Sequence, residues 1–409
     1  MSSRCSSPRP TNAGSRSSQS ERPGLHPFVD VGSLQRVTEA TEATEETEAP
    51  ETTEATEASD RPGSHDPLVI GGHEIEPGER RLVRLPAPGH FGRGDVTMAV
   101  HVCHGRHPGP RLFVLAAVHG DEINGVEAIR RVLGRRLLDE IHGTLFAIPV
   151  VNVLGFANRS RYLPDRRDLN RSFPGRESGS LAARYAHLLG SEIIARCSHG
   201  IDLHTGAVHR TNMPHLRGDL ADPRIVEMAQ AFGAPLILDT RGPDGTLLEV
   251  SRVHDVPVLV YEGGEALRFD EVAIRTAERG VLAVMRSLGM LPRGRARKHP
   301  RPPIVTRHSR WVRAPKSGML LTAMKLGVAV TKGQTVARIA DPYSGEQVDV
   351  LAPLAGIVIG LLVQPLVNEG DAIVHVARIG DGDDLDAASG ELDDYFADPS
   401  FDMSWPESS

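Results

Sequence analysis

The chain has 409 residues, a formal net charge of −7 and 40% apolar residues, enough for a substantial core in about two to three domains. Its three cysteines exclude a disulfide framework and a zinc site built from cysteines, and they indicate a reducing compartment, so we expect a cytoplasmic protein. All four lysines follow residue 297, which excludes phosphate-loop and Schiff-base lysine chemistry in the first 297 residues.

The negative charge is concentrated in two acidic tracts. Residues 38–60 hold nine acids and no base, residues 380–409 hold ten acids and no base, and the rest of the chain carries +12. We therefore expect residues 1–66 to form a disordered N-terminal tail with an acidic low-complexity tract, and residues 380–409 to form an acidic flexible tail. No apolar run reaches the ~18–20 residues that cross a bilayer, so we expect no membrane partner.

Residues 67–292 alternate between strand-like and helix-like patterns. The first predicted strand is Arg111–Val118, and apolar residues at helical spacing follow at Asn124–Leu138. Such alternation predicts an α/β fold with a mainly parallel mixed sheet flanked by helices. In such sheets ligands bind beyond the carboxyl ends of strands, so polar residues directly after strands are site candidates. The further predicted strands are Thr144–Val151, Gly200–Leu203 and Val256–Tyr261, and the further predicted helices are Leu181–Ala195 and Asp222–Phe232.

Three residues after strand ends have the chemistry of metal ligands. The first strand is followed by His119-Gly120-Asp121-Glu122, which offers a nitrogen and an oxygen ligand three residues apart. His204, after the strand Gly200–Leu203, offers a second nitrogen, and two histidines with one glutamate are a known zinc ligand set. The spacing alone leaves open that these histidines are surface or packing residues.

Two other motifs carry residues suited to binding and catalysis. Asn170 and Arg171 are adjacent in a loop, where Arg171 offers a planar fork for a carboxylate and Arg161 a second cation. An ion pair between Arg171 and a nearby acid such as Asp168 is the alternative. Glu262 follows a Val-rich strand and is a candidate general base, with a helix cap or an ion-pair partner as the alternative.

Together, the motifs HGDE, DLNRSFPG, DLHTG and YEGGE, in this order, resemble the succinylglutamate desuccinylase/aspartoacylase family. That family is a branch of the zinc-carboxypeptidase-like fold. The resemblance covers residues 67–292 as a zinc hydrolase catalytic domain and residues 312–379 as the family's smaller C-terminal β domain.

The resemblance also implies roles for individual residues and one Zn²⁺ per subunit. His119, Glu122 and His204 match the zinc ligands, and Glu262 matches the general acid/base that acts on zinc-activated water. The remaining matches concern the substrate: Asn170 and Arg171 correspond to the carboxylate clamp, Arg161 to the arginine that polarises the scissile carbonyl, and Asn152 to a substrate-side asparagine.

The last third of the chain has a different composition. Residues 293–311 are basic and Pro-rich and are predicted to form a linker. Residues 312–379 repeat a short pattern, with Ala314-Pro315 before Gly318 and Ala352-Pro353 before Gly356, which predicts a small β-sandwich resembling a biotinyl/lipoyl domain. The tripeptide Ala323-Met324-Lys325 resembles a biotin-carrier motif, but the turn between the halves, residues 341–345, holds no lysine, so we expect no carrier function.

The leading hypothesis from the sequence is a zinc-dependent amidohydrolase that removes an acyl group from an N-acyl amino acid or a related small carboxylate-bearing amide. A metallo-carboxypeptidase that trims acidic residues from a peptide is the first alternative. A non-catalytic binding module is the second, although the basic segment lacks the interleaved aromatic residues that stack on bases, so we expect no nucleic-acid partner. The oligomeric state stays open, a homo-oligomer included.

Overall fold

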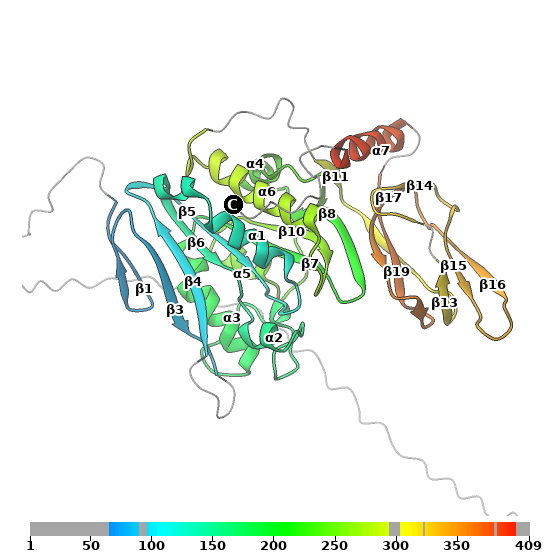
Figure 1. The fold of residues 1–409 in the computed structure, drawn as a ribbon, viewed down its shortest axis with the longest axis horizontal. Coiled ribbons are helices and arrows are strands. Elements are labelled where there is room, and N and C mark those ends of the chain that lie inside the picture. Colours follow the sequence, from blue (N-terminus) through cyan, green and yellow to red (C-terminus); the bar gives the residue numbers. More distant parts are fainter. Residues whose placement is uncertain (1–64, 90–95, 294–302, 322–323, 380–382, 398–409) are drawn as a thin grey trace, which may run out of the picture. The chain divides into compact units, whose positions relative to one another are not determined.

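The computed structural model describes residues 65–89, 96–293, 303–321, 324–379 and 383–397. At its centre four parallel strands lie side by side in the order β6, β5, β7, β10 (Figure 1). All four predicted strands are present, and they are buried because their residues are mostly apolar. Their bounds are β5 (His107–Ala116), β6 (His142–Ile148), β7 (His199–Gly206) and β10 (Val258–Glu265).

Antiparallel strands flank this parallel centre on both sides. Beyond β6 lie β4 and then β3, and beyond β10 lies β8, which in turn pairs in parallel with β9. The prediction of a mixed sheet is therefore confirmed: the four central strands are parallel, the strands next to them are antiparallel, and β9 pairs in parallel with β8 at one side. The flanking strands are β3 (Arg80–Pro86), β4 (Thr97–His104), β8 (Arg210–Gly218) and β9 (Leu236–Asp239).

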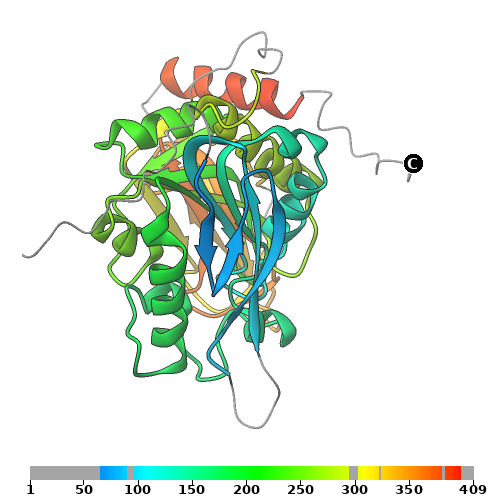
Figure 2. The same ribbon diagram turned by 90° about the vertical axis from the view of Figure 1, so that its left-hand side faces the viewer.

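Helices cover both faces of the sheet, as predicted (Figures 1 and 2). Alternate residues of β5 point to opposite faces: Leu112 and Val114 pack with α1, α4 and α6, whereas Phe113 and Leu115 pack with α3, α5 and the hairpin of β1 and β2. These elements are α1 (Asn124–Leu133), α3 (Leu181–Glu192), α4 (Pro223–Phe232), α5 (Leu247–Val253), α6 (Glu271–Ser287), β1 (Leu68–Ile70) and β2 (His73–Ile75). None of the helices in the described residues is long and apolar enough to cross a membrane.

The C-terminal strands do not form a domain with two sheets of its own. One group, in the order β12, β19, β17, continues the central sheet because β17 pairs antiparallel with β8. The other group is a separate four-stranded sheet in the order β16, β15, β13, β18, and the two groups share an apolar core. The strands are β12 (Ser309–Arg313), β13 (Gly318–Leu321), β14 (Ala329–Val330), β15 (Thr335–Ala340), β16 (Gln347–Leu351), β17 (Gly356–Leu362), β18 (Leu366–Val367) and β19 (Ala372–Arg378).

The sequence repeat corresponds to repeated strand pairing. Gly318 begins β13, which pairs with β15, and Gly356 begins β17, which pairs with β19. The predicted turn at residues 341–345 joins β15 to β16. The biotin-carrier-like tripeptide lies partly outside the described residues, and the likeness to biotinyl and lipoyl domains stays a prediction.

Two segments predicted to lack regular structure form elements. Within the expected linker, Ile304–Thr306 is strand β11, which pairs in parallel with β9, and β12 begins at Ser309. Within the expected flexible tail, Asp383–Phe396 is helix α7. Leu385, Ala388 and Leu392 of this helix are buried against β17, so the prediction of a flexible tail is wrong for these residues. The predicted N-terminal tail falls almost wholly outside the described residues.

Candidate active site

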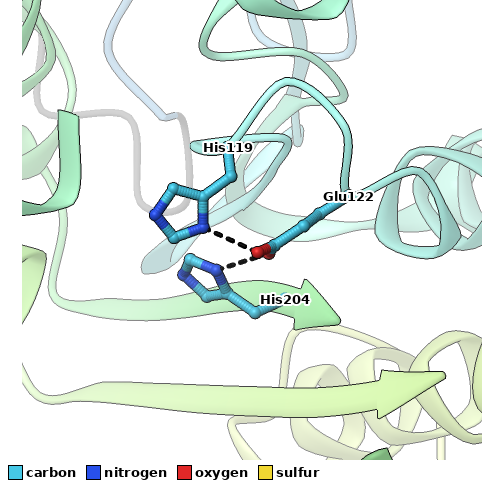
Figure 3. A group of neighbouring side chains, drawn as sticks. All are labelled: His119, Glu122 and His204. Atoms are coloured by element: carbon cyan, nitrogen blue, oxygen red, sulfur yellow. Dashed lines mark hydrogen bonds and ion pairs between the residues drawn. The ribbon is translucent and has the colours of Figure 1, made fainter. Parts of the chain in front are cut away.

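The motif at the end of β5 forms a tight turn that presents two side chains. The backbone N–H of Glu122 donates to the carbonyl of His119 at 3.1 Å, which places both side chains on one side of the turn (Figure 3). Gly120 is required by packing, because a Cβ at this position would lie 2.1 Å from the backbone of Gly155 at the start of a short helix, α2 (Val153–Ala157). The chain therefore holds His119 and Glu122 rigidly beyond the carboxyl end of the strand.

His204 reaches the same point from the neighbouring strand β7. Its Nδ1 lies 2.8 Å from Oε2 of Glu122, while Nδ1 of His119 lies 2.8 Å from Oε1 (Figure 3). The three side chains are buried, and one ligand atom from each lies within 4.8 Å of the others. Two imidazole nitrogens thus converge on one carboxylate.

The outer nitrogen of each histidine is bound to a second acid. Nε2 of His119 lies 3.1 Å from Oδ1 of Asp168, and Nε2 of His204 lies 2.8 Å from Oδ2 of Asp202. Burial opposes a charge on these imidazoles, but the surrounding carboxylates outweigh it and raise the pKa of both His119 and His204. The same imidazoles outweigh the effect of burial on Glu122 and lower its pKa.

This arrangement fits a divalent metal ion. A neutral imidazole has one N–H, and if it donates this from Nε2 to its acid, Nδ1 has only a lone pair and cannot donate to Glu122. The two short contacts between Nδ1 and Glu122 therefore require either an extra proton on each imidazole or a cation between the nitrogens and the carboxylate. A metal ion of charge +2 supplies the same charge as these two protons. Metal-bound histidines also usually donate their other N–H to an acid, as Asp168 and Asp202 allow here. The donor set of two nitrogens and one oxygen suits zinc.

Glu262 lies beside this cluster on β10, directly opposite His204 in the strand pairing. Burial raises the pKa of its carboxyl group above the ordinary value of 4.5. Two side chains of β8 hold it: Asn212 donates to Oε2 at 3.1 Å, and the guanidinium of Arg217 lies 3.5 Å from Oε1. A carboxyl group whose pKa is raised in this way is suited to general acid/base catalysis.

A cavity of about 220 Å³ connects these groups. Arg161 lines it with its guanidinium paired to Asp168 at 3.0 Å and to Glu122 at 3.3 Å. Asn170 and Arg171 line the wall at the start of α5, where Oδ1 of Asn170 accepts from the backbone N–H of Leu247 at 2.9 Å. Among the described residues no acid forms an ion pair with Arg171, so its guanidinium can bind a carboxylate.

Comparison with known proteins identifies the family. Residues 108–288 match the succinylglutamate desuccinylase/aspartoacylase catalytic domain. Residues 108–288 of this chain therefore form a catalytic domain of the succinylglutamate desuccinylase/aspartoacylase family. One relative, the N-alpha-acetyl-L-2,4-diaminobutyric acid deacetylase of Halomonas elongata, is 26% identical over 338 residues, which are 78% of this chain and 98% of the relative.

Two solved structures share the fold of this chain. The crystal structure of a succinylglutamate desuccinylase/aspartoacylase from Rhodobacter sphaeroides superimposes with a TM-score of 0.67 at 26% identity, over 73% of this chain and 95% of that one. The product-bound structure of the ectoine utilization protein EutE (DoeB) from Ruegeria pomeroyi gives 0.66 at 22% identity over the same shares. The predicted family and the α/β fold with a mixed sheet are therefore confirmed.

The structure brings together seven of the eight residues that the family resemblance assigned. The seven line one cavity: His119, Glu122, Arg161, Asn170, Arg171, His204 and Glu262. Asn152 does not line it. Its Oδ1 accepts from the backbone N–H of Gly155 at 2.8 Å as the cap of α2, and its Nδ2 donates to the carbonyl of Arg161 at 3.4 Å. The amide of Asn152 thus holds α2 and the backbone of Arg161 in place, and its predicted contact with the substrate stays a prediction.

Four further residues in contact with the site were not predicted. Asp202 lies two positions before His204, a spacing that puts two strand residues on one face, so this partner was within reach of sequence reasoning. Asp168 was considered only as an ion-pair partner of Arg171, whereas it binds His119 and Arg161. Asn212 and Arg217 lie on β8, whose mixture of polar and apolar residues gave no strand prediction.

Proposed function

We propose that this chain is a zinc-dependent amidohydrolase that removes an acyl group from an N-acyl amino acid with a free carboxylate. The observation that carries the proposal is one cavity that combines a cluster able to hold a metal ion, a buried carboxylate beside it and the guanidinium of Arg171, which has no acid partner among the described residues. The deacetylase of Halomonas elongata, an enzyme named for an N-acetylated amino acid, supports this choice of reaction.

His119, Glu122 and His204 would hold the zinc ion, and Asp168 and Asp202 would orient the two imidazoles. When bound, zinc supplies a Lewis acid for the scissile carbonyl and lowers the pKa of a coordinated water from 15.7 to about 7. Three protein ligands leave the remaining coordination positions for water and substrate, as hydrolysis requires.

Glu262 is proposed as the proton carrier. In its charged form it accepts a proton from the attacking water, and it delivers this proton to the leaving nitrogen as the C–N bond breaks. Asn212 and Arg217 hold the carboxylate in place for both steps. Positioned proton transfer of this kind contributes about 10²–10⁴-fold to the rate.

Arg161 and Arg171 are proposed to act on different ends of the substrate. Arg161 faces the metal-ligand residue Glu122 and can donate to the carbonyl oxygen as negative charge develops on it. Arg171, with the side-chain amide of Asn170 beside it, binds the free carboxylate of the substrate. This contact fixes the scissile amide bond of the substrate against Glu262. The substrate is then held at two points, which is what productive orientation needs.

Metal analysis and hydrolysis assays on the purified full-length chain test this proposal. We expect one zinc per chain and release of free amino acid from N-acyl substrates, and we expect His119→Ala to lose both. Glu262→Gln should keep the zinc while its turnover falls by about 10²–10⁴-fold. Full activity of the zinc-free wild type, or no hydrolysis of any N-acyl amino acid by the zinc-loaded wild type, would overturn it.

The cavity volume favours a small substrate over the alternative of a carboxypeptidase. Its roughly 220 Å³ is less than the ~300–1,000 Å³ of sites that hold drug-sized ligands. A peptide that extends past its last residue or two would have to leave the cavity. Assays against a poly-glutamate peptide discriminate the two readings, because a deacylase should leave it intact.

A further inference from the structure

One buried amide behind the candidate active site has no part in the proposed chemistry. Asn124 is 1% exposed and is the first residue of α1, two positions after Glu122. It does not line the cavity, so it does not contact a substrate held there. A buried side-chain amide has donors and an acceptor that need partners, and these partners indicate its role.

The side chain of Asn124 joins two segments that lie far along the chain. Its Nδ2 donates to the backbone carbonyl of Gly263 at 3.3 Å, and its Oδ1 accepts from the backbone N–H of Asp270 at 3.2 Å. Gly263 directly follows Glu262 on β10, and Asp270 is the N-cap of α6. One amide thus connects the turn that carries Glu122 to the strand end that carries Glu262.

Strand β10 leaves the regular ladder directly after Glu262. Between Glu262 and Glu265, three steps along β10 match two steps along β7. Such a bulge leaves a residue without its ladder partner and redirects the side chains around it. Gly264, within the bulge, has a φ of +77°, and a Cβ there would lie 2.3 Å from Nδ2 of Asn124. The backbone next to Glu262 is therefore shaped around this amide.

The helix that carries Asn124 is fixed by packing to the strands that precede the two histidines. A Cβ at Gly125, the next residue of α1, would lie 2.7 Å from Cβ of Leu203 and 2.8 Å from Cβ of Ala116. Leu203 is on β7 directly before His204, and Ala116 ends β5. The start of α1 is thus in direct contact with both strands, and Asn124 extends from a rigid base to the bulge.

We propose that Asn124 is a positioning residue that sets the place of Glu262 relative to the turn that carries Glu122. It acts through the carbonyl of Gly263 and touches neither the substrate nor the reacting atoms. The inference rests on the proposed function for the role of Glu262 as proton carrier. A displacement of about 1 Å at a catalytic group can cost about 10²-fold in rate, so the loss of this contact is measurable.

Asn124→Asp removes one contact and keeps the shape of the side chain. An oxygen still accepts from Asp270, but the group that donated to Gly263 becomes an acceptor. The aspartate stays ionised, because the first turn of a helix favours negative charge. For an N-acetyl amino acid that the wild type hydrolyses, we expect kcat to fall about 10- to 100-fold, KM to stay within about threefold, and one zinc per chain to be retained. A kcat equal to that of the wild type would overturn the proposal.

A double-mutant cycle with Glu262→Gln shows whether Asn124 acts through Glu262. Glutamine cannot carry the proton, so its placement no longer limits turnover. Asn124→Asp should therefore lower the kcat of Glu262→Gln by less than about twofold. If it lowers this kcat by the same factor as in the wild type, Asn124 supports the site as a whole and the proposal is wrong.

Thr144→Val is the matched control for the loss of a buried hydrogen bond. Thr144 is buried near the amino end of β6, outside the cavity, and its Oγ1 lies 2.9 Å from Nδ1 of His104. Urea unfolding should show a lower midpoint for Thr144→Val and for Asn124→Ala alike, but only Asn124→Ala should lose turnover. An equal loss of kcat in Thr144→Val would mean that stability alone sets the rate, which contradicts the proposal.

The outcomes separate this inference from the proposed function. Full turnover in Glu262→Gln would reject the proton carrier, whereas its loss together with wild-type turnover in Asn124→Asp would reject only the role of Asn124. If Asn124→Asp fails to fold, Asn124→Ala takes its place in the cycle. Hydrogen exchange on the wild type needs no variant: the backbone amide of Asp270 should exchange slowly, and rapid exchange would show that Asn124 does not hold it.

Discussion

Glu262 owes its chemistry to opposing effects of its surroundings. Burial raises its pKa, whereas nearby cations, among them Arg217 at 3.5 Å, lower it. In Arg217→Gln one of these cations is gone, so the pKa of Glu262 rises further. Because the proposed base must be deprotonated, activity is lost on the acid side as pH falls through this pKa. The acid limb of the kcat/KM profile should therefore move to higher pH, by about one unit.

The pH profile distinguishes this effect from a general loss of structure. A disturbed site would lower kcat/KM at every pH without moving the limb. Arg268→Gln serves as the control, because Arg268 is exposed and its one ion pair within the described residues is with Glu265, and its profile should match the wild type. An acid limb that stays in place in Arg217→Gln would contradict the role given to Arg217.

The site residues that belong to short sequence motifs could be predicted from the sequence, and those outside such motifs were missed. His119, Glu122 and His204 follow strands, so their convergence could be expected from the topology of a parallel sheet. Arg210 and Trp311 are about one hundred positions apart, and only the pairing of distant strands brings them together. Nothing local in the sequence records such a contact, so only the structure could show it.

Helix α7 was not predicted because its sequence is rich in acidic residues. Its acids suggested a solvated tail, but Leu385, Ala388 and Leu392 recur at helical spacing and form one buried face. Leu392 is 1% exposed and packs in the cluster that contains Ile357 and Ile359 of β17. The acids lie on the solvent side of an amphipathic helix, so composition alone misled the prediction.

The buried face of α7 predicts a loss of stability on truncation. Leu392→Ala leaves a cavity against β17 and should lower the free energy of unfolding by about 2–5 kcal/mol. Urea unfolding monitored by circular dichroism measures this difference. Asp386→Ala, at an exposed position of the same helix, should change it by no more than about 0.5 kcal/mol. Equal stability of Leu392→Ala and the wild type would mean that α7 does not pack on the sheet in solution.

At the scale of the whole molecule, the catalytic and C-terminal parts share one sheet. β8 lies between them: Asn212 on this strand donates to Glu262 and also lies opposite Gly360 of β17 in the pairing. The internal repeat let the sequence predict two β halves, but it carried no information on which strand would join the central sheet. The pairing of β17 with β8, called the joint below, makes the C-terminal strands part of the active-site wall, and Trp311 is the residue by which they line the cavity.

Two histidines at this joint, the buried His215 and the half-buried His375, make the molecule sensitive to acid. Burial lowers the pKa of His375 to about 3 and that of His215 to about 4. In the unfolded chain both imidazoles bind a proton near pH 6.5. Between that pH and about 4 the unfolded state therefore holds more protons than the folded state, so stability falls as pH falls through this window. The expected loss between pH 7.5 and 5.5 is about 1.4 kcal/mol for each histidine.

His375→Phe isolates one of these contributions. Phenylalanine can keep an aromatic ring stacked on Trp311 but cannot bind a proton, so the variant should lose about 1.4 kcal/mol less stability than the wild type between pH 7.5 and 5.5. Urea unfolding at the two pH values measures the difference. His254→Gln, which replaces an exposed histidine, should lose as much as the wild type. If His375→Phe loses as much as the wild type, His375 takes up its proton in the folded state, and the joint is more open to water than its packing indicates.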